Sequence, residues 1–429
     1  MKRILIEQGR VIDPANSIDR TGPVYVADGK ILALFEKPDG FEADSVIDAS
    51  GQIVCPGFID ISTRLRQPGQ SHKATFQTET KAAAAGGITT LILQPDTRPV
   101  IDTPAITELV KELAENSNYR QILPIGALTR NLEGQELSSM LALQEAGCIA
   151  VGNGGKPISN LLVLRRAMEY AASHDLLLIY RPNEQSLSNE GCAHEGAFST
   201  RYGLPGIPET AETIALSQCL ELAELTGCRV HFGQISCRRS VIKIQQAQKY
   251  GLSVSADIAA HQLHLTENDM KPFDSVYHVL PPLRSEQDKL FLRKALMQGT
   301  IGTLCSDHQP HDLDAKLGAF PETEPGISAL ETLLPLMLKL VDEKLITLSQ
   351  GIAALTQTPA KVLRLESGTL TPGKSADICI FDPGRRWQVD RSTWYSKGIN
   401  TPYWGEQLTG RVSATLQSGK IIYQGVFHD

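Results

Sequence analysis

The sequence predicts an α/β protein, with a TIM-type (β/α)8 barrel at its centre and a small β-sandwich built from both chain ends. From residue 53 to about residue 365, short apolar segments alternate with helical stretches, as in a parallel sheet. About eight such units over roughly 310 residues fit a closed barrel better than a doubly wound sheet. The two ends instead alternate apolar runs with turn residues, as antiparallel strands do. We therefore expect the barrel at 53–365 and the sandwich at 1–52 and 366–429.

Each element follows from its local pattern, taken here in chain order. The strands expected in the first part of the sandwich are Ile4–Ile6, Val24–Val26 and Ile31–Leu34. The strands expected in the barrel are Ile53–Ile59, Thr89–Leu93, Ile122–Ala127, Cys148–Val151, Leu176–Tyr180, Arg229–Phe232, Ser253–Asp257 and Ile301–Cys305. The strands expected at the end of the chain are Ile378–Phe381, Gly410–Leu416 and Lys420–Val426. Helices are expected at Ala105–Asn116, after the start signal Asp102-Thr103-Pro104, and at Glu209–Leu225.

Composition excludes several classes of partner. The 429 residues carry a formal net charge of −7, so the chain has no basic footprint for nucleic acid or anionic lipid. Its longest apolar runs are far shorter than the ~20 residues that cross a bilayer, and its first residues lack the pattern of a signal peptide. The eight cysteines form no C-x-x-C pair and are expected to be buried, reduced thiols. These features predict a cytoplasmic protein without a membrane partner.

Polar segments follow five of the expected barrel strands. They are 60–69, 94–99, 181–184, 233–236 and 306–311. The functional residues of such barrels lie at the carboxyl ends of the strands, so these segments are expected to meet at one face.

A series of landmarks in order along the chain resembles dihydroorotase and the related cyclic amidohydrolases, which include allantoinase and dihydropyrimidinase. The matching segments are Pro56-Gly57-Phe58-Ile59-Asp60, Pro281-Pro282-Leu283-Arg284, Ser306-Asp307-His308-Gln309-Pro310-His311, Pro325-Gly326-Ile327, Leu330-Glu331-Thr332 and Gly373-Lys374-Ser375-Ala376-Asp377-Ile378. The resemblance covers nearly the whole chain. It implies the fold of the amidohydrolase superfamily, a metal-bearing (β/α)8 barrel with a β-sandwich from both chain ends.

The chain departs from this family where the family binds its metals. The positions that match lost metal ligands are Ser62, Arg64, Asn153, Arg181 and Gln234. The first two replace a His-x-His pair, the third replaces a carboxylated lysine or an aspartate, and the last two replace histidines. Only the final aspartate ligand is kept, as Asp307.

The positions that match substrate contacts are kept in part. The two asparagines of the family are replaced by Asp96 and Leu280. The two contacts to the substrate carboxylate remain, as Arg66 and His311. In a site without metal, these two residues could still bind a carboxylate or could be inherited structure.

These replacements predict that the chain binds no zinc and has no catalytic residues. A hydrolytic zinc site needs three or more nitrogen or oxygen donors and an open position for water. Guanidinium groups have no lone pair to donate and stay protonated, so Arg64 and Arg181 would repel a divalent cation. A buried aspartate is costly when unpaired, so at least one of these arginines is expected within hydrogen-bonding reach of Asp307.

A chain that loses its ligands but keeps its fold suggests a role in assembly. In some bacteria an inactive dihydroorotase homologue is the non-catalytic chain of aspartate transcarbamoylase, and the sequence is similar to that type of subunit. The resemblance therefore implies a structural role in de novo pyrimidine biosynthesis. Its partner would be the aspartate transcarbamoylase catalytic chain, in a dodecamer of six plus six, and the chain could also associate with itself as a dimer.

Two other functions stay open at this stage. The first is an active metal-dependent cyclic amidohydrolase with an unusual ligand set drawn from Asp96, Asp307, His308 and His311. The second is a metal-free module that binds a small carboxylate through Arg66 and His311.

Two weaker ideas concern other residues. A displaced metal site at His261, His264, His308 and His311 is less favoured than ordinary packing, and so is a nucleophilic role for Cys237 or Cys305.

Overall fold

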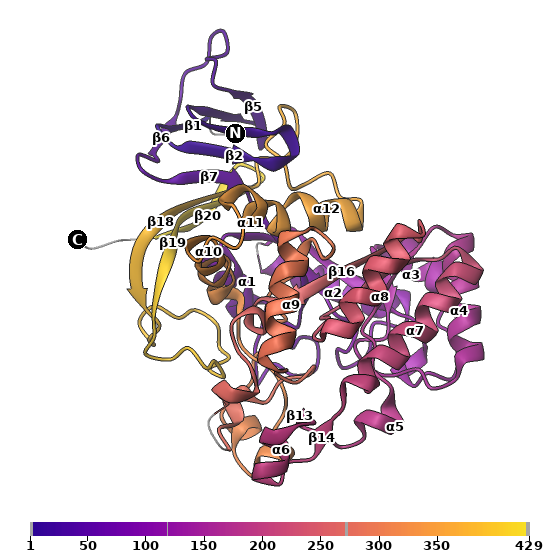
Figure 1. Cartoon of the computed structure of the whole chain (residues 1–429). Coiled ribbons are helices and arrows are strands. Elements are labelled where there is room, and N and C mark those ends of the chain that lie inside the picture. The colour runs from indigo at the N-terminus through magenta and orange to yellow at the C-terminus, as the bar shows by residue number, and fades with distance from the viewer. Residues whose placement is uncertain (1–2, 118, 271–272, 426–429) are drawn as a thin grey trace.

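The computed structural model describes residues 3–117, 119–270 and 273–425. It confirms the predicted fold class, an eight-stranded parallel barrel beside a two-sheet sandwich (Figure 1). The first strands of the chain and its last strands lie together at one end of the molecule, and the barrel fills the other end. None of the described helices is long and apolar enough to span a membrane.

The barrel sheet pairs its strands in parallel, in chain order from β8 to β17. Its strands are β8 (Phe58–Thr63), β9 (Ile88–Leu93), β10 (Ile122–Ala127), β11 (Ala150–Gly152), β12 (Leu177–Tyr180), β15 (Arg229–Phe232), β16 (Val254–Ala259) and β17 (Thr303–Cys305). The first and last strands meet just beyond their carboxyl ends, where Thr63 pairs with His308 and the Arg64 amide donates to the His308 carbonyl at 3.0 Å. This seam positions two of the predicted site segments side by side.

Helices follow the barrel strands and pack outside the sheet (Figure 1). The longer ones are α1 (Phe76–Ala85), α2 (Pro104–Asn116), α3 (Met140–Ala146), α4 (Leu161–Ser173), α7 (Glu209–Thr226), α8 (Arg238–Lys249), α9 (Glu286–Met297), α10 (Leu333–Asp342), α11 (Leu348–Leu355) and α12 (Gln357–Leu363). A small excursion between β12 and α7 carries α5 (Gln185–Ser188), β13 (Ala193–His194), α6 (Ala197–Tyr202) and β14 (Gly206–Ile207).

The sandwich consists of two sheets around a separate apolar core. One sheet contains β1 (Ile4–Glu7), β4 (Val24–Ala27), β5 (Lys30–Leu34) and β6 (Ser45–Asp48). The other contains β2 (Arg10–Asp13), β3 (Ile18–Thr21), β7 (Ile53–Pro56), β18 (Ile378–Gln388), β19 (Gln407–Gln417) and β20 (Lys420–Gln424). Because β7 pairs with both β2 and β18, the two chain ends share one sheet.

The expected strand Ile53–Ile59 is two strands that belong to different domains. β7 lies in the sandwich and β8 begins the barrel, so the domains divide at Gly57 rather than after residue 52. A Cβ at Gly57 would lie 2.2 Å from the Thr89 side chain, so only glycine fits at this close crossing. Both β7 and β8 are buried, so the apolar run continues from one strand into the next. For this reason the sequence pattern did not show that one strand ends and another begins here.

Other boundaries shift by a few residues. The expected Cys148–Val151 strand is β11, which starts two residues later, and β18 and β19 extend beyond the apolar runs that predicted them. Val426, the last residue of the expected final strand, lies outside the described residues. Helix α2 begins at Pro104, one residue before the expected Ala105, and its preceding Thr103 makes no side-chain capping bond.

Candidate functional site

Two of the predicted positions meet where the barrel closes. Ser62 lies near the carboxyl end of β8, and Asp307 follows β17. The Ser62 hydroxyl donates to the Asp307 carboxylate at 3.4 Å. The Gln309 amide donates to the other carboxylate oxygen of Asp307 at 3.1 Å. The carboxyl is buried, and this burial raises its pKa to about 6 even though Arg64 and Arg181 act in the opposite direction.

Arg64 joins two carboxylates rather than one. Its Nε donates to Asp96 Oδ2 at 2.7 Å, and its Nη1 lies 3.6 Å from Asp307 Oδ1. A third contact runs from Nη2 to the Gly154 carbonyl at 3.2 Å. The expected pairing of an arginine with Asp307 is thus found as an ion pair, but the hydrogen bond expected there goes to Asp96. The reason is geometric, because a guanidinium can present different N–H groups to two partners, and in Arg64 the Nε side makes the shorter contact, with Asp96.

Arg181 contacts carbonyl oxygens and no carboxylate. Its Nη1 donates to the Leu280 carbonyl and its Nη2 to the Gly155 carbonyl, each at 3.1 Å. The guanidinium lies against Gly155, where an added Cβ would be 2.5 Å from Cζ. Burial and the charge of Arg64 lower the pKa of Arg181 from its usual range. Within the described residues no acidic group comes within 4 Å of this arginine, so of the two arginines only Arg64 forms an ion pair with Asp307.

Asn153 and Gln234 are held in networks of their own. The Thr129 hydroxyl donates to the Asn153 side-chain oxygen at 2.8 Å, and the Asn153 amide donates to the Lys156 carbonyl at 3.0 Å. Gln234, with φ of 50°, donates its backbone N–H to Asp257 Oδ1 at 2.8 Å. These contacts leave neither amide directed at Asp307.

Asp257 is a site residue that the sequence reasoning missed. Besides Gln234 it contacts the buried His231, whose Nε2 lies 3.0 Å from Oδ2, and the thiol of Cys305. The signal was present, because Asp257 is the one carboxylate in an expected strand of otherwise small residues, and the expected strand before it carries His231.

Arg66 and His311, the two positions expected to match substrate contacts, lie against each other. Arg66 Nη2 is 3.0 Å from His311 Nε2, and Arg66 Nε donates to the Pro310 carbonyl at 2.9 Å. Burial and neighbouring cations lower the pKa of His311 to about 2, so its ring is neutral. Lys73 Nζ lies 3.3 Å from His311 Nδ1, and Nε2 lies 3.0 Å from both the Arg66 guanidinium and the Pro325 carbonyl. Both residues therefore have partners within the protein.

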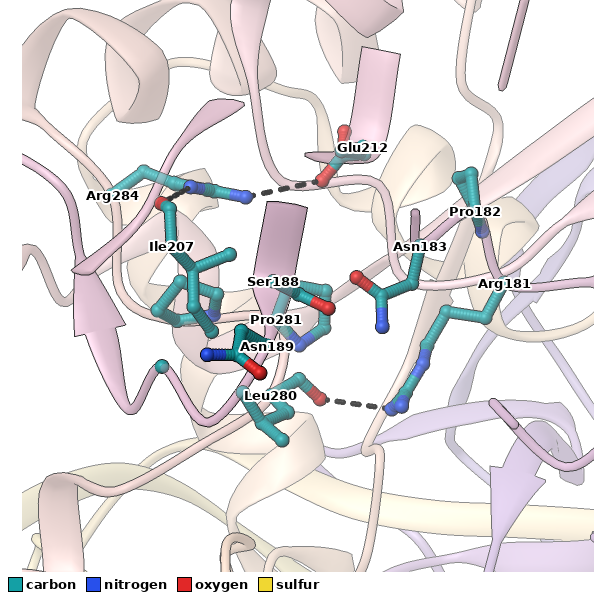
Figure 2. A pocket seen from close by; sticks show the side chains of 12 residues that line it. Arg181, Pro182, Asn183, Ser188, Asn189, Ile207, Glu212, Leu280, Pro281 and Arg284 are labelled. Atoms are coloured by element: carbon teal, nitrogen blue, oxygen red, sulfur yellow. Dashed lines mark hydrogen bonds and ion pairs between the residues drawn. The ribbon is translucent and has the colours of Figure 1, made fainter. Parts of the chain in front are cut away.

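The two replaced asparagine positions have diverged in chemistry. Asp96 is the hydrogen-bonded partner of Arg64. Burial acts to raise the pKa of Asp96, but the charge and hydrogen bond of Arg64 outweigh it, so the pKa of Asp96 is lowered. Leu280 offers only its backbone carbonyl, to Arg181, and an apolar side chain that lines a cavity (Figure 2).

The four histidines of the displaced-site idea have different partners. His308 lies 2.9 Å from the buried Glu79, and His264 Nε2 contacts the Leu336 carbonyl at 2.9 Å. His261 Nδ1 has no partner among the described residues, and burial lowers the pKa of His261 to about 4. His311 is engaged as described above. The structure therefore does not bring these four rings to one point.

The two candidate nucleophiles are protonated thiols. Burial raises the pKa of both Cys237 and Cys305, and each thiol lies against a carboxylate, Glu212 and Asp257 respectively. All eight cysteines are free and buried, as the sequence predicted.

The residues at the positions expected to match metal ligands do not fit a divalent cation. They supply a hydroxyl, two amides, two guanidinium groups and one carboxylate, and that carboxylate already faces Arg64. In residues 3–117, 119–270 and 273–425, no three His, Cys, Asp or Glu side chains are grouped as a metal site would require. The arrangement can hold charges in fixed positions and can bind small polar groups, but its donors do not match those of a zinc hydrolase.

Comparison with known proteins agrees with this fold. The family model described as dihydro-orotase-like matches residues 51–240, and a model described as amidohydrolase family matches residues 336–423. The L-hydantoinase (dihydropyrimidinase) of Arthrobacter aurescens has the same fold, with a TM-score of 0.85 and 24% identity over 99% of this chain and 96% of that one.

Curated relatives match the chain from end to end. A dihydroorotase-like protein of Pseudomonas aeruginosa is 44% identical over 98% of this chain and 100% of its own length. A protein of Syntrophus aciditrophicus named dihydroorotase is 40% identical over 98% of this chain and 99% of its own length. The chain therefore belongs to the dihydroorotase-like family of the amidohydrolase superfamily.

Proposed function

We propose that this chain is a catalytically inactive member of its family and serves as a structural, non-catalytic subunit of aspartate transcarbamoylase in pyrimidine biosynthesis. The observation that carries the first half is the position of Arg64. Its guanidinium lies between Asp96 and Asp307, so a fixed protein cation stands beside the one retained ligand.

This arrangement lacks the groups that metal-dependent hydrolysis requires. Arg64 and Arg181 place two protonated guanidinium groups where a metal would need lone pairs. Asp307 is engaged by Ser62, Gln309 and Arg64, so it is not free to hold a metal or to accept a proton from water. No group in this constellation would then lower the pKa of a water molecule to supply the nucleophile that opens a cyclic amide.

The assembly role rests on the resemblance and on the preservation of the fold. In the described residues the barrel and the sandwich keep their sheets, including the one that joins the two chain ends, which is expected when shape is what matters. Relatives in two Pseudomonas species carry the name dihydroorotase-like protein, a wording compatible with a non-catalytic role. The catalytic chain of aspartate transcarbamoylase, in a six-plus-six dodecamer, is the partner that the resemblance implies.

An active amidohydrolase with an atypical ligand set is the second candidate, because several relatives are named dihydroorotase. Its proposed ligands were Asp96, Asp307, His308 and His311. Here both aspartates contact Arg64, while His308 contacts Glu79 and His311 contacts Arg66. These separate partners favour the inactive reading.

Light scattering tests the assembly role directly. The chain, the aspartate transcarbamoylase of the same organism and their equimolar mixture are each separated by size, and transcarbamoylase activity is measured across the peaks. A new species of several hundred kilodaltons that contains both chains is expected. Two unshifted peaks would overturn the proposal.

A parallel measurement tests inactivity. We expect no stoichiometric zinc after gentle purification and no hydrolysis of dihydroorotate by the chain alone. Bound zinc together with hydrolysis that Asp307→Ala abolishes would establish the second candidate instead.

A further inference from the structure

A small cavity opens beside Arg181 at the carboxyl face of the barrel. It has a volume of about 80 Å³ and lies between the end of β12, the α5 excursion and the segment Leu280–Arg284. A single water needs roughly 10–15 Å³ on this measure, so the cavity has room for several waters or one small molecule. Figure 2 shows Arg181, Asn183 and Asn189 around this space.

The Arg181 guanidinium is fixed in position but only partly used. It is held by two carbonyls and lies flat on the backbone of Gly155. Two of its five N–H groups donate to these carbonyls, which leaves three without a partner in the described part of the chain. A guanidinium held in this way loses little freedom when it binds a ligand.

No described acidic side chain pairs directly with Arg181, and Asp307 and Asp96 act on its charge only from beyond ion-pair distance. Two other arginines at this face have acidic partners, since Arg64 contacts Asp96 and Asp307, and Arg284 lies 3.8 Å from Glu212, whereas Arg66 contacts the Pro310 carbonyl and His311. Burial and the Arg64 charge lower the pKa of Arg181, which is the direction expected for a cation that lacks a counter-ion.

The cavity also presents amide donors next to this cation. The side chains of Asn183 and Asn189 line it, and neither makes a hydrogen bond to the described residues. The single carboxylate in the lining, Glu212, is taken up by the Ser236 and Cys237 backbone N–H groups and by Arg284. A ligand would therefore meet an unpaired guanidinium and free amides, with the only acid already engaged.

We propose that this cavity binds a small oxyanion, a carboxylate or a phosphate, through the free edge of Arg181 and the amide of Asn183. Arginine binds both chemistries in bidentate fashion, and an adjacent amide can donate to a third oxygen. The site is distinct from the retained Arg66 and His311 pair, whose partners lie within the protein. The proposal does not depend on the assembly role, because it concerns binding by the chain alone.

Calorimetry with malonate and with inorganic phosphate tests it on the full chain. Saturable binding of at least one probe is expected, and the tighter of the two identifies the ligand as a carboxylate or a phosphate. Arg181→Gln keeps donors for the carbonyls but removes the charge, so binding should weaken by about tenfold or more. Arg165→Gln, at an exposed α4 arginine that pairs with Glu169, is the matched control and should bind as the wild type does.

Two results would overturn the proposal. One is the absence of saturable binding of either probe to the wild-type chain. The other is unchanged affinity in Arg181→Gln. If circular dichroism shows that Arg181→Gln does not fold, Asn183→Ala decides the question, because its amide faces the cavity without supporting the fold through any hydrogen bond to a described residue. Weaker binding in Asn183→Ala supports the site, and equal binding refutes it.

Discussion

Removing the Arg64 guanidinium should destabilise the barrel, because it would leave Asp96 and Asp307 without their shared cation. The side chains of Arg64 and Asp307 are 9% and 3% exposed, and that of Asp96 is 24% exposed. Breaking a buried ion pair typically costs about 3–5 kcal/mol. Since Asp96 retains some contact with water, we expect Arg64→Gln to lower the free energy of unfolding at pH 7 by about 3 kcal/mol.

The loss should depend on pH in a defined direction. The folded pKa of Asp96 lies below its unfolded value, so its pairing stabilises the protein above that value and stops doing so as the pH falls. In Arg64→Gln both carboxyls become harder to ionise when folded, so the variant is penalised most at neutral pH. The difference between variant and wild type should therefore shrink as the pH is lowered from 7 toward 4.

An exposed pair of equal bond length provides the control. Arg10 Nε lies 2.7 Å from Asp19 Oδ1, the same distance as in the buried pair, but the two side chains are 49% and 42% exposed. Exposed ion pairs contribute about 0–1 kcal/mol, so Arg10→Gln should have a small effect. Urea unfolding of both variants, followed by circular dichroism from pH 4 to pH 7, gives the comparison. An equal, small loss in both variants, or a loss in Arg64→Gln that does not vary with pH, would refute this account of the site.

Three further changes test neighbouring parts of the structure. Burial raises the pKa of Asp307 to about 6 in the folded protein. Protonated Asp307 therefore stabilises the fold fully below the unfolded pKa of an aspartate, and this stabilisation is lost as the pH rises toward 6. In a pH series of urea unfolding, Asp307→Asn should remove this fall in stability, which is about 3 kcal/mol at most. Gly155→Ala should displace the Arg181 guanidinium and weaken oxyanion binding in calorimetry, and unchanged binding would contradict the packing described here. Glu79→Ala removes the buried partner of His308 and Ser396, and a loss of about 2–4 kcal/mol with faster proteolysis near Ser396 is expected.

The sequence by itself determined the fold class, and it predicted the loss of the metal ligands. The spacing of apolar runs is enough to distinguish parallel barrel strands from sandwich strands, because each architecture buries its strands in a different periodic pattern. The identities of Arg64 and Arg181 were sufficient to predict a misfit with zinc, since no conformation gives a guanidinium a lone pair.

Only the tertiary structure decided which groups contact one another. Arg64, which was expected to bond Asp307, makes its short contact with Asp96 instead. Asp257 contacts both His231 and the backbone N–H of Gln234. The strand break at Gly57 was also hidden, because burial on both sides makes one apolar run of two strands. Partner choice depends on angles and distances between segments that are far apart in the chain, and a single sequence carries no direct record of them.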